Sequence, residues 1–135
     1  PAGFDLWVVN QKLPFMSYSH TGENPWLTEL ASRNTKVFTV GINAATARAK
    51  GIADGDRILL ETPDGKTAEG TARLTEGLHP DCLNVPGVLG RWSVGNERGS
   101  RKGVHFNSLM TYSFERMDTV AAALDACVKV RVRKA

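Results

Sequence analysis

Short runs of apolar and β-branched residues, separated by turn residues, recur along the chain. They predict strands over six segments: residues 4–10, 36–42, 57–62, 67–74, 82–85 and 128–133. An Asp-Gly pair within residues 63–66 predicts a tight hairpin between the third and fourth of these strands. Six or seven short strands with tight turns favour a small, mainly β-barrel over a doubly wound sheet, which would need more helix.

Helical signals are few and short. Pro25 suits the first turn of a helix over residues 26–33, and Asn43 is a good cap for a helix over residues 44–50 that Gly51 would end. Residues 118–126 predict a third short helix. Trp26, inside the first of these helices, is predicted to pack in the core.

Two polar loops, residues 17–24 and 87–107, concentrate glycines, aromatic residues and hydrogen-bonding side chains. Long irregular loops inside a compact domain usually carry function, and glycines let backbone N–H groups approach a ligand closely. His105 and Asn107 have donors and acceptors suited to the edge of a heterocycle. The alternatives are structural: Asn107 as a cap, or Trp92 as a packing residue. The loops therefore indicate a binding site without fixing its ligand.

Charge changes this picture only slightly. The 135 residues hold 17 Lys and Arg against 14 Asp and Glu, a net charge of +3, which is not the footprint of a dedicated nucleic-acid-binding protein. Within the second loop, positive charge gathers at Arg91, Arg98, Arg101 and Lys102, where it can face an anion. Basic residues also alternate along residues 128–134, which indicates a solvated strand face.

No catalytic constellation stands out in the sequence. The three histidines match no zinc-binding spacing, and neither a nucleophile elbow nor a phosphate-binding loop motif occurs. Cys82 and Cys127 are predicted to be two buried thiols, with a disulfide as the alternative. These absences favour binding over an independent hydrolase or lyase activity.

The order of motifs is specific enough to indicate a family. Four stretches follow one another along the chain: Ser-His-Thr-Gly-Glu-Asn-Pro-Trp-Leu-Thr-Glu-Leu at 19–30, Val-Gly-Ile-Asn-Ala-Ala-Thr-Ala at 40–47, Gly-Ile-Ala-Asp-Gly-Asp at 51–56 and Gly-Val-His-Phe-Asn-Ser-Leu at 103–109. In this order, residues 4–134 resemble the C-terminal molybdopterin-dinucleotide-binding domain of the dimethyl sulfoxide reductase superfamily. The first and last stretches most resemble the polysulfide/thiosulfate reductase-like branch.

The resemblance implies a double-psi β-barrel with a six-stranded core. It also implies that residues 1–135 are a single domain of a larger catalytic subunit, a two-electron oxidoreductase in which this domain alone is not catalytic. The cofactor implied is bis(molybdopterin guanine dinucleotide) with molybdenum or tungsten. The metal's ligand and any iron–sulfur cluster would lie in other domains. A free-standing double-psi barrel that binds a small ligand or nucleic acid is the alternative.

The resemblance also implies site residues and partners. Asn107 matches the family's pterin-contacting asparagine, whereas His105 stands where the family often has Asn or Gly. The implied cofactor contacts, none of them metal ligands, are Ser19, His20, Thr21, Asn24, Trp92, His105 and Asn107. The implied partners are the remaining domains of the subunit, an iron–sulfur electron-transfer subunit and a membrane anchor, with no nucleic acid; the compartment stays open.

Overall fold

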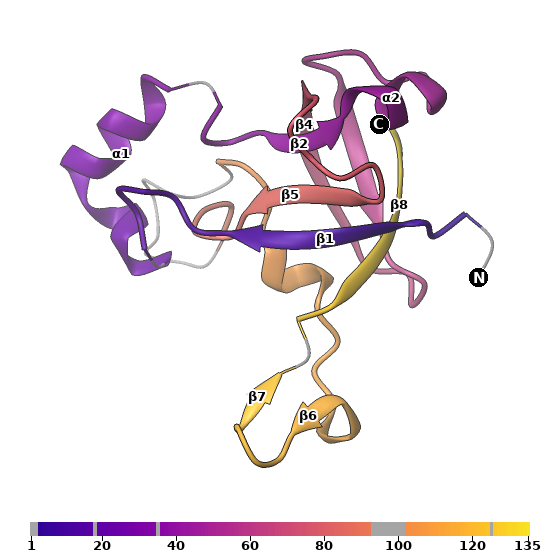
Figure 1. Cartoon of the computed structure of the whole chain (residues 1–135). Helices are drawn as coiled ribbons and strands as arrows, with labels where there is room; N and C mark the ends of the chain where they lie inside the picture. The colour runs from indigo at the N-terminus through magenta and orange to yellow at the C-terminus, as the bar shows by residue number, and fades with distance from the viewer. Residues whose placement is uncertain (1–2, 18, 35, 93–101, 125) are drawn as a thin grey trace.

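The strands close into one barrel. The structure, a computed structural model, describes residues 3–17, 19–34, 36–92, 102–124 and 126–135. Six strands form the closed order β1-β5-β2-β4-β3-β8 (Figure 1). Their bounds are β1 Leu6–Gln11, β2 Val40–Asn43, β3 Arg57–Glu61, β4 Thr67–Thr75, β5 Cys82–Pro86 and β8 Val128–Lys134. Each strand has both neighbours within this chain, so the barrel closes without a strand from elsewhere.

Two parallel strand pairs define the topology. β1 pairs with β5 in parallel, and β2 pairs with β4 in parallel. The antiparallel pair of β2 and β5 joins them, and β3 and β8 complete the circle through antiparallel pairs. This is a mainly β, double-psi β-barrel, which confirms the predicted fold class.

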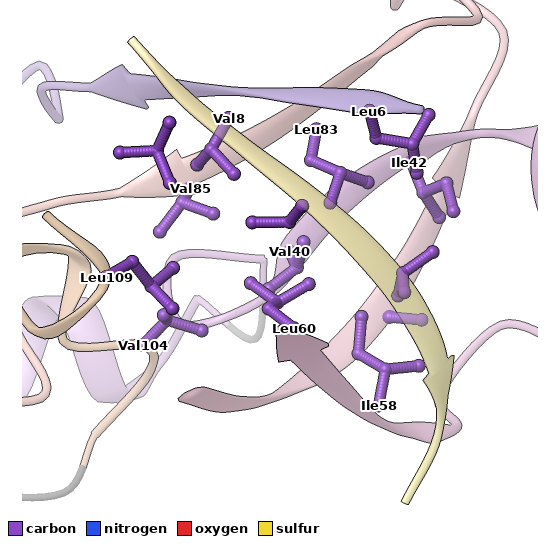
Figure 2. Close-up of a cluster of buried hydrophobic side chains, with 14 of the residues drawn as sticks. Leu6, Val8, Val40, Ile42, Ile58, Leu60, Leu83, Val85, Val104 and Leu109 are labelled. Atoms are coloured by element: carbon purple, nitrogen blue, oxygen red, sulfur yellow. The ribbon is translucent and has the colours of Figure 1, made fainter. Parts of the chain in front are cut away.

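Alternation along the strands fills the barrel with aliphatic side chains. Figure 2 shows residues of β1, β2, β3 and β5, among them Ile42, Leu60 and Leu83, pointing toward one another. These three have no exposed surface. In β8, Val128, Val130 and Val132 are buried while the residues between them face outward, as the basic alternation predicted.

Short helices attach to the barrel at capped ends. α1 spans Pro25–Ser32, and the Asn24 Oδ1 atom accepts hydrogen bonds from the backbone N–H groups of Trp26 and Leu27. α2 spans Ala44–Ala49, and the Asn43 side chain caps it in the same way. The 3-10 helix η1 covers Ser19–Glu23. The first two predicted helices are therefore confirmed to within one residue at each end.

The 3-10 helix η2, Phe106–Leu109, packs into the barrel core. Phe106 is only 1% exposed and belongs to the same buried cluster as the strand residues, together with Val104 and Leu109. This packing fixes the backbone of residues 104–109 against the barrel.

A second, smaller apolar cluster joins α1 to the segments that follow β5. Met16, Ala31, Val37, Val88 and Leu89 are its buried members. The cluster lies outside the barrel and holds three separate segments of chain together. It explains one correction: residues 36–39 form a turn rather than the start of a strand, because Val37 is buried in this cluster and not in the sheet.

The predicted helix over residues 118–126 is also wrong. β6, Met117–Asp118, and β7, Ala123–Leu124, pair antiparallel instead, after the 3-10 helix η3 at Phe114–Arg116. The Asp118 carboxylate accepts hydrogen bonds from the N–H groups of Val120 and Ala121, but the next residue, Ala122, has a positive φ of 49°, which turns the chain back instead of continuing a helix. Figure 1 shows this β6–β7 hairpin projecting away from the barrel.

Three side chains are less buried than predicted. Trp26 is 80% exposed, because α1 buries Thr28 and Ala31 on its inner side. Cys82 is half-buried and Cys127 is exposed. In the part of the chain that the structure describes, no helix has the length and apolar character needed to cross a membrane.

Candidate functional site

A cavity of about 1120 Å³ lies against the outer face of β3 and β4. The outward residues of these strands, Arg57, Leu59, Glu69, Thr71 and Arg73, form its floor. Its walls come from the end of α1, from the turn after it and from both ends of the second predicted loop; they include Ser32, Lys36, Phe38, Thr39, Gly90, Trp92, Gly103, His105 and Ser108. Four separate segments of the chain therefore converge here.

A smaller cavity, of about 230 Å³, lies beside it over β1 and β5. Gln11, Pro14, Asn84 and Pro86 are among its lining residues. Lys36, Thr39 and Arg73 line both cavities. These three residues, called the ridge below, separate the larger cavity from the smaller one.

Two glycines allow the walls to approach the barrel closely. A Cβ atom on Gly90 would lie 2.6 Å from the backbone N atom of His105, and Gly90 has a positive φ of 86°. A Cβ atom on Gly70 would lie 2.7 Å from the Val104 Cγ2 atom. Only glycine fits at these positions. The segments that carry Trp92 and His105 are thereby brought together over β4.

Trp92 and His105 form the polar and aromatic wall of the larger cavity. Their ring centroids are 4.7 Å apart and the rings are nearly perpendicular, at 88°. The His105 Nδ1 atom is buried and has no hydrogen-bond partner among the described residues. Burial, helped by the positive charge of Arg91, lowers the pKa of His105. The imidazole is therefore neutral at pH 7 and offers a buried ring nitrogen to a ligand.

Arg73 and Asn84 carry further unpaired polar atoms. The Arg73 Nε atom and the Asn84 Oδ1 atom are buried, and neither has a partner among the described residues. The Asn84 Nδ2 atom donates to the Gln11 Oε1 atom. Buried polar groups are nearly always hydrogen-bonded, so orphaned atoms at a cavity indicate a missing ligand or water.

The structure brings together only part of the predicted site. Trp92 and His105 lie in contact at the larger cavity. Ser19, His20 and Thr21 lie in η1, and Asn24 caps α1; no described part of either cavity lining includes them. Asn107 is exposed in η2, outside both linings, although its neighbour Ser108 lines the larger cavity.

The structure describes only two of the four basic residues of the second loop. Arg91 lies close enough to His105 to affect its pKa, and the Lys102 Nζ atom is 3.5 Å from the Ser32 Oγ atom at the end of α1. Arg98 and Arg101 lie outside the described residues.

Sequence reasoning missed Arg73, Asn84 and Lys36. One signal was available: Arg73 falls between apolar residues in an alternating run, which puts its side chain on the outer face of a strand. Its proximity to Asn84 depends on strand register, which the sequence does not display. Across the described ranges, no three His, Cys, Asp or Glu side chains gather in a group able to hold a metal ion.

Comparison with known proteins identifies the family. The sequence model described as "Molydopterin dinucleotide binding domain" matches residues 6–126. The chain therefore belongs to the molybdopterin dinucleotide-binding domains of the dimethyl sulfoxide reductase superfamily, as its motifs predicted.

Particular relatives are much longer than this chain. The thiosulfate reductase molybdopterin-containing subunit PhsA of Salmonella typhimurium (strain LT2) is 31% identical over 108 residues, which cover 80% of this chain and 14% of that subunit. Among solved structures, acetylene hydratase from Pelobacter acetylenicus matches with a TM-score of 0.73 and 12% identity, over 98% of this chain and 18% of its own. The second likeness supports the fold alone. The chain spans less than a fifth of either protein.

The residues of the site fit a molybdopterin dinucleotide. Such a molecule combines a polar heterocycle, a diphosphate and a nucleoside. The buried His105 Nδ1 and Asn84 Oδ1 atoms can pair with groups of a heterocycle or a sugar, and Arg73 can pair with a phosphate. The close backbone approach at Gly90 leaves this wall no room for larger side chains.

Proposed function

We propose that this chain binds and orients a molybdopterin guanine dinucleotide as one domain of a two-electron oxidoreductase. One observation carries the proposal: His105 holds a buried ring nitrogen, without a hydrogen-bond partner among the described residues, against Trp92 at the larger cavity. Membership of the dinucleotide-binding family supports the same ligand. The remainder of the catalytic subunit would supply the other half of the site.

His105 is the orienting residue in this proposal. A neutral imidazole can donate from one ring nitrogen and accept at the other, so it can pair with a pterin edge without adding charge. The perpendicular Trp92 ring restricts rotation of the imidazole. Ser108 adds a hydrogen bond from its Oγ atom to the His105 carbonyl oxygen, at 2.7 Å, which fixes the local backbone.

The metal and the electron-transfer groups belong to the parent enzyme. When bound, the cofactor would supply two-electron chemistry at molybdenum or tungsten, in the bis(dinucleotide) form. Any iron–sulfur cluster, the iron–sulfur subunit and a membrane anchor would be contributed by other domains or chains. The part of this chain in catalysis is to bind and position, so its isolated form would not be catalytic.

Ser19, His20, Thr21, Asn24 and Asn107 remain proposed cofactor contacts. His20, Thr21, Asn24 and Asn107 are not among the described lining residues of the two cavities, so their contacts would be made with parts of the dinucleotide that extend beyond the cavities. Asn24 would do so with its Nδ2 atom, since its Oδ1 atom caps α1.

The test uses the enzyme that contains this chain, purified without oxygen. Guanine nucleotide released by acid and bound metal are measured in the parent enzyme and in a His105→Ala variant. We expect molybdenum or tungsten with guanine nucleotide in the parent, and at least a several-fold lower nucleotide content in the variant. His79→Ala is the matched control, because His79 is exposed in the turn before β5. Equal nucleotide content in both variants, or none in the parent, would contradict the proposal.

A further inference from the structure

We propose that Arg73 and Lys36 form a phosphate-binding subsite on the ridge between the two cavities. Its ligand is the diphosphate of a nucleotide, and Asn84 accepts a hydrogen bond from the neighbouring sugar or base. This inference rests on the proposed function, because that function makes the ligand a dinucleotide.

Strand register places the subsite on three adjacent strands. In β2, Gly41 pairs with Arg73 of β4 on one side and with Asn84 of β5 on the other. All three residues lie on the outer face, because Ile42, Ala72 and Leu83 beside them are buried. The Arg73 and Asn84 side chains therefore flank a strand position that has no side chain of its own.

Gly41 keeps this surface open. A Cβ atom at this position would lie 3.2 Å from the Asn84 Cβ atom and 3.4 Å from the Arg73 Nη2 atom. The guanidinium thus lies over bare backbone, where a ligand can approach it from the side of the cavities.

Among the described residues, the two cations of the subsite have no ion-pair partner. Arg57, another cation on the cavity floor, pairs with Glu69. Neither Arg73 nor Lys36 is in an ion pair among the described residues, and the buried Arg73 Nε atom lacks any hydrogen bond there. Burying an unpaired donor of a charged group costs free energy, so an anion that satisfies it is bound favourably.

The turn that carries Lys36 is fixed in place by its own contacts. The buried Val37 side chain anchors the turn in the second apolar cluster. The Asn34 Oδ1 atom accepts a hydrogen bond from the Lys36 N–H group, and the Thr39 Oγ1 atom donates to the Lys36 carbonyl oxygen at 2.8 Å. An ammonium group from the turn and a guanidinium from the strand thereby line the same two cavities.

The position between the cavities favours a diphosphate over a terminal phosphate. A diphosphate in a dinucleotide is an anionic link between two bulky, uncharged ends. The ridge lies between a cavity of about 1120 Å³ and one of about 230 Å³. A guanidinium can bind two phosphate oxygens at once, which an ammonium group cannot, so Arg73 is the principal contact.

The test is a titration of the 135-residue chain, labelled with ¹⁵N, with pyrophosphate, with GDP and with guanosine. We expect pyrophosphate and GDP to shift the Arg73 Nε–H signal, and guanosine alone to leave it in place. An Arg73→Gln variant is expected to bind pyrophosphate at least ten-fold more weakly. The matched control is Arg133→Gln, an exposed position on β8 that lines neither cavity.

An Arg73→Lys variant separates geometry from charge. It keeps the positive charge and loses the paired N–H groups, so we expect an intermediate loss of pyrophosphate affinity. A dispersed amide spectrum for each variant shows that the barrel is intact.

Two results would overturn the phosphate subsite. One is equal pyrophosphate binding by the Arg73→Gln and Arg133→Gln variants, and the other is a wild-type chain that binds guanosine but not pyrophosphate. Neither result touches the His105→Ala test on the parent enzyme. If that test still shows dinucleotide loss, the proposed function stands without this subsite.

Discussion

Gly90 shows how one residue sets the geometry of the site. A methyl group in its place would lie 2.6 Å from two backbone atoms, the His105 N atom and the Val104 C atom. Neither atom can move without shifting the segment that leads into η2. The position also has a positive φ, which L-residues adopt at a cost.

We therefore expect Gly90→Ala to lower the free energy of unfolding by about 3 kcal/mol, the sum of backbone strain and overpacking. Gly55→Ala is the matched control, because Gly55 also has a positive φ but its Cβ would meet nothing within 4 Å. The control should lose only about 1 kcal/mol. Urea unfolding followed by circular dichroism measures both. Equal losses would mean that the close approach at Gly90 is not what constrains the site.

Individual residues were the hardest feature to predict. Trp92 and His105 were proposed as site residues because their glycine-rich loop concentrates aromatic and hydrogen-bonding side chains and because the family resemblance implies cofactor contacts there. Arg73, Gly41 and Asn84 are each ordinary residues of a strand, and only the register of three strands makes them neighbours. Trp26 was predicted to be buried from its apolar side chain alone, although the helix turns it toward solvent.

At the scale of elements, the β3–β4 hairpin forms hydrogen bonds with the segment that follows η2. The Thr111 Oγ1 atom donates to the Asp64 carboxylate at 2.5 Å, and the Lys66 Nζ atom donates to the Met110 carbonyl oxygen at 2.7 Å. The hydrogen bonds from Thr111 and then Thr62 hold the pKa of Asp64 well below its usual value. This network stabilises the end of the segment that carries His105.

The low pKa of Asp64 in the folded state makes the free energy of unfolding depend on pH. A carboxyl group whose pKa is lower in the folded state stabilises the fold at neutral pH, and this contribution is lost as the pH falls from about 4 toward the folded pKa. Asp64 is partly exposed to solvent, so we expect Asp64→Asn to cost only about 1 kcal/mol at pH 7. Between pH 5 and pH 2, the unfolding free energy of the variant should decline less than that of the wild type. Parallel pH profiles for the two proteins would contradict this role.

Elements with a strong local signal were predicted well. The barrel strands show alternation and the helices α1 and α2 have capping residues, so their existence follows from local chemistry. The errors at residues 36–39 and 118–126 have a tertiary cause and a local cause, respectively. Val37 belongs to a cluster outside the barrel, and Ala122 has a positive φ that a helix does not tolerate.

At the scale of the whole molecule, the barrel and the β6–β7 hairpin contribute unequally to stability. Val130 in β8 has no exposed surface, whereas Val120 at the tip of the hairpin is 96% exposed. We expect Val130→Asp to prevent folding, because it buries an unpaired charge in the core. Val120→Asp should change the unfolding free energy by less than about 0.5 kcal/mol. Thermal unfolding of both variants tests this; a large loss from Val120→Asp would mean that the hairpin packs against the barrel.

The place of β8 in the barrel has a consequence for synthesis on the ribosome. β8 lies between β1 and β3, so the first and last strands of this chain are neighbours. Until residues 128–134 have left the exit tunnel, one side of the barrel is open and its aliphatic interior is in contact with water. The nascent chain is thus a substrate for chaperones that bind exposed apolar segments until its last strand emerges.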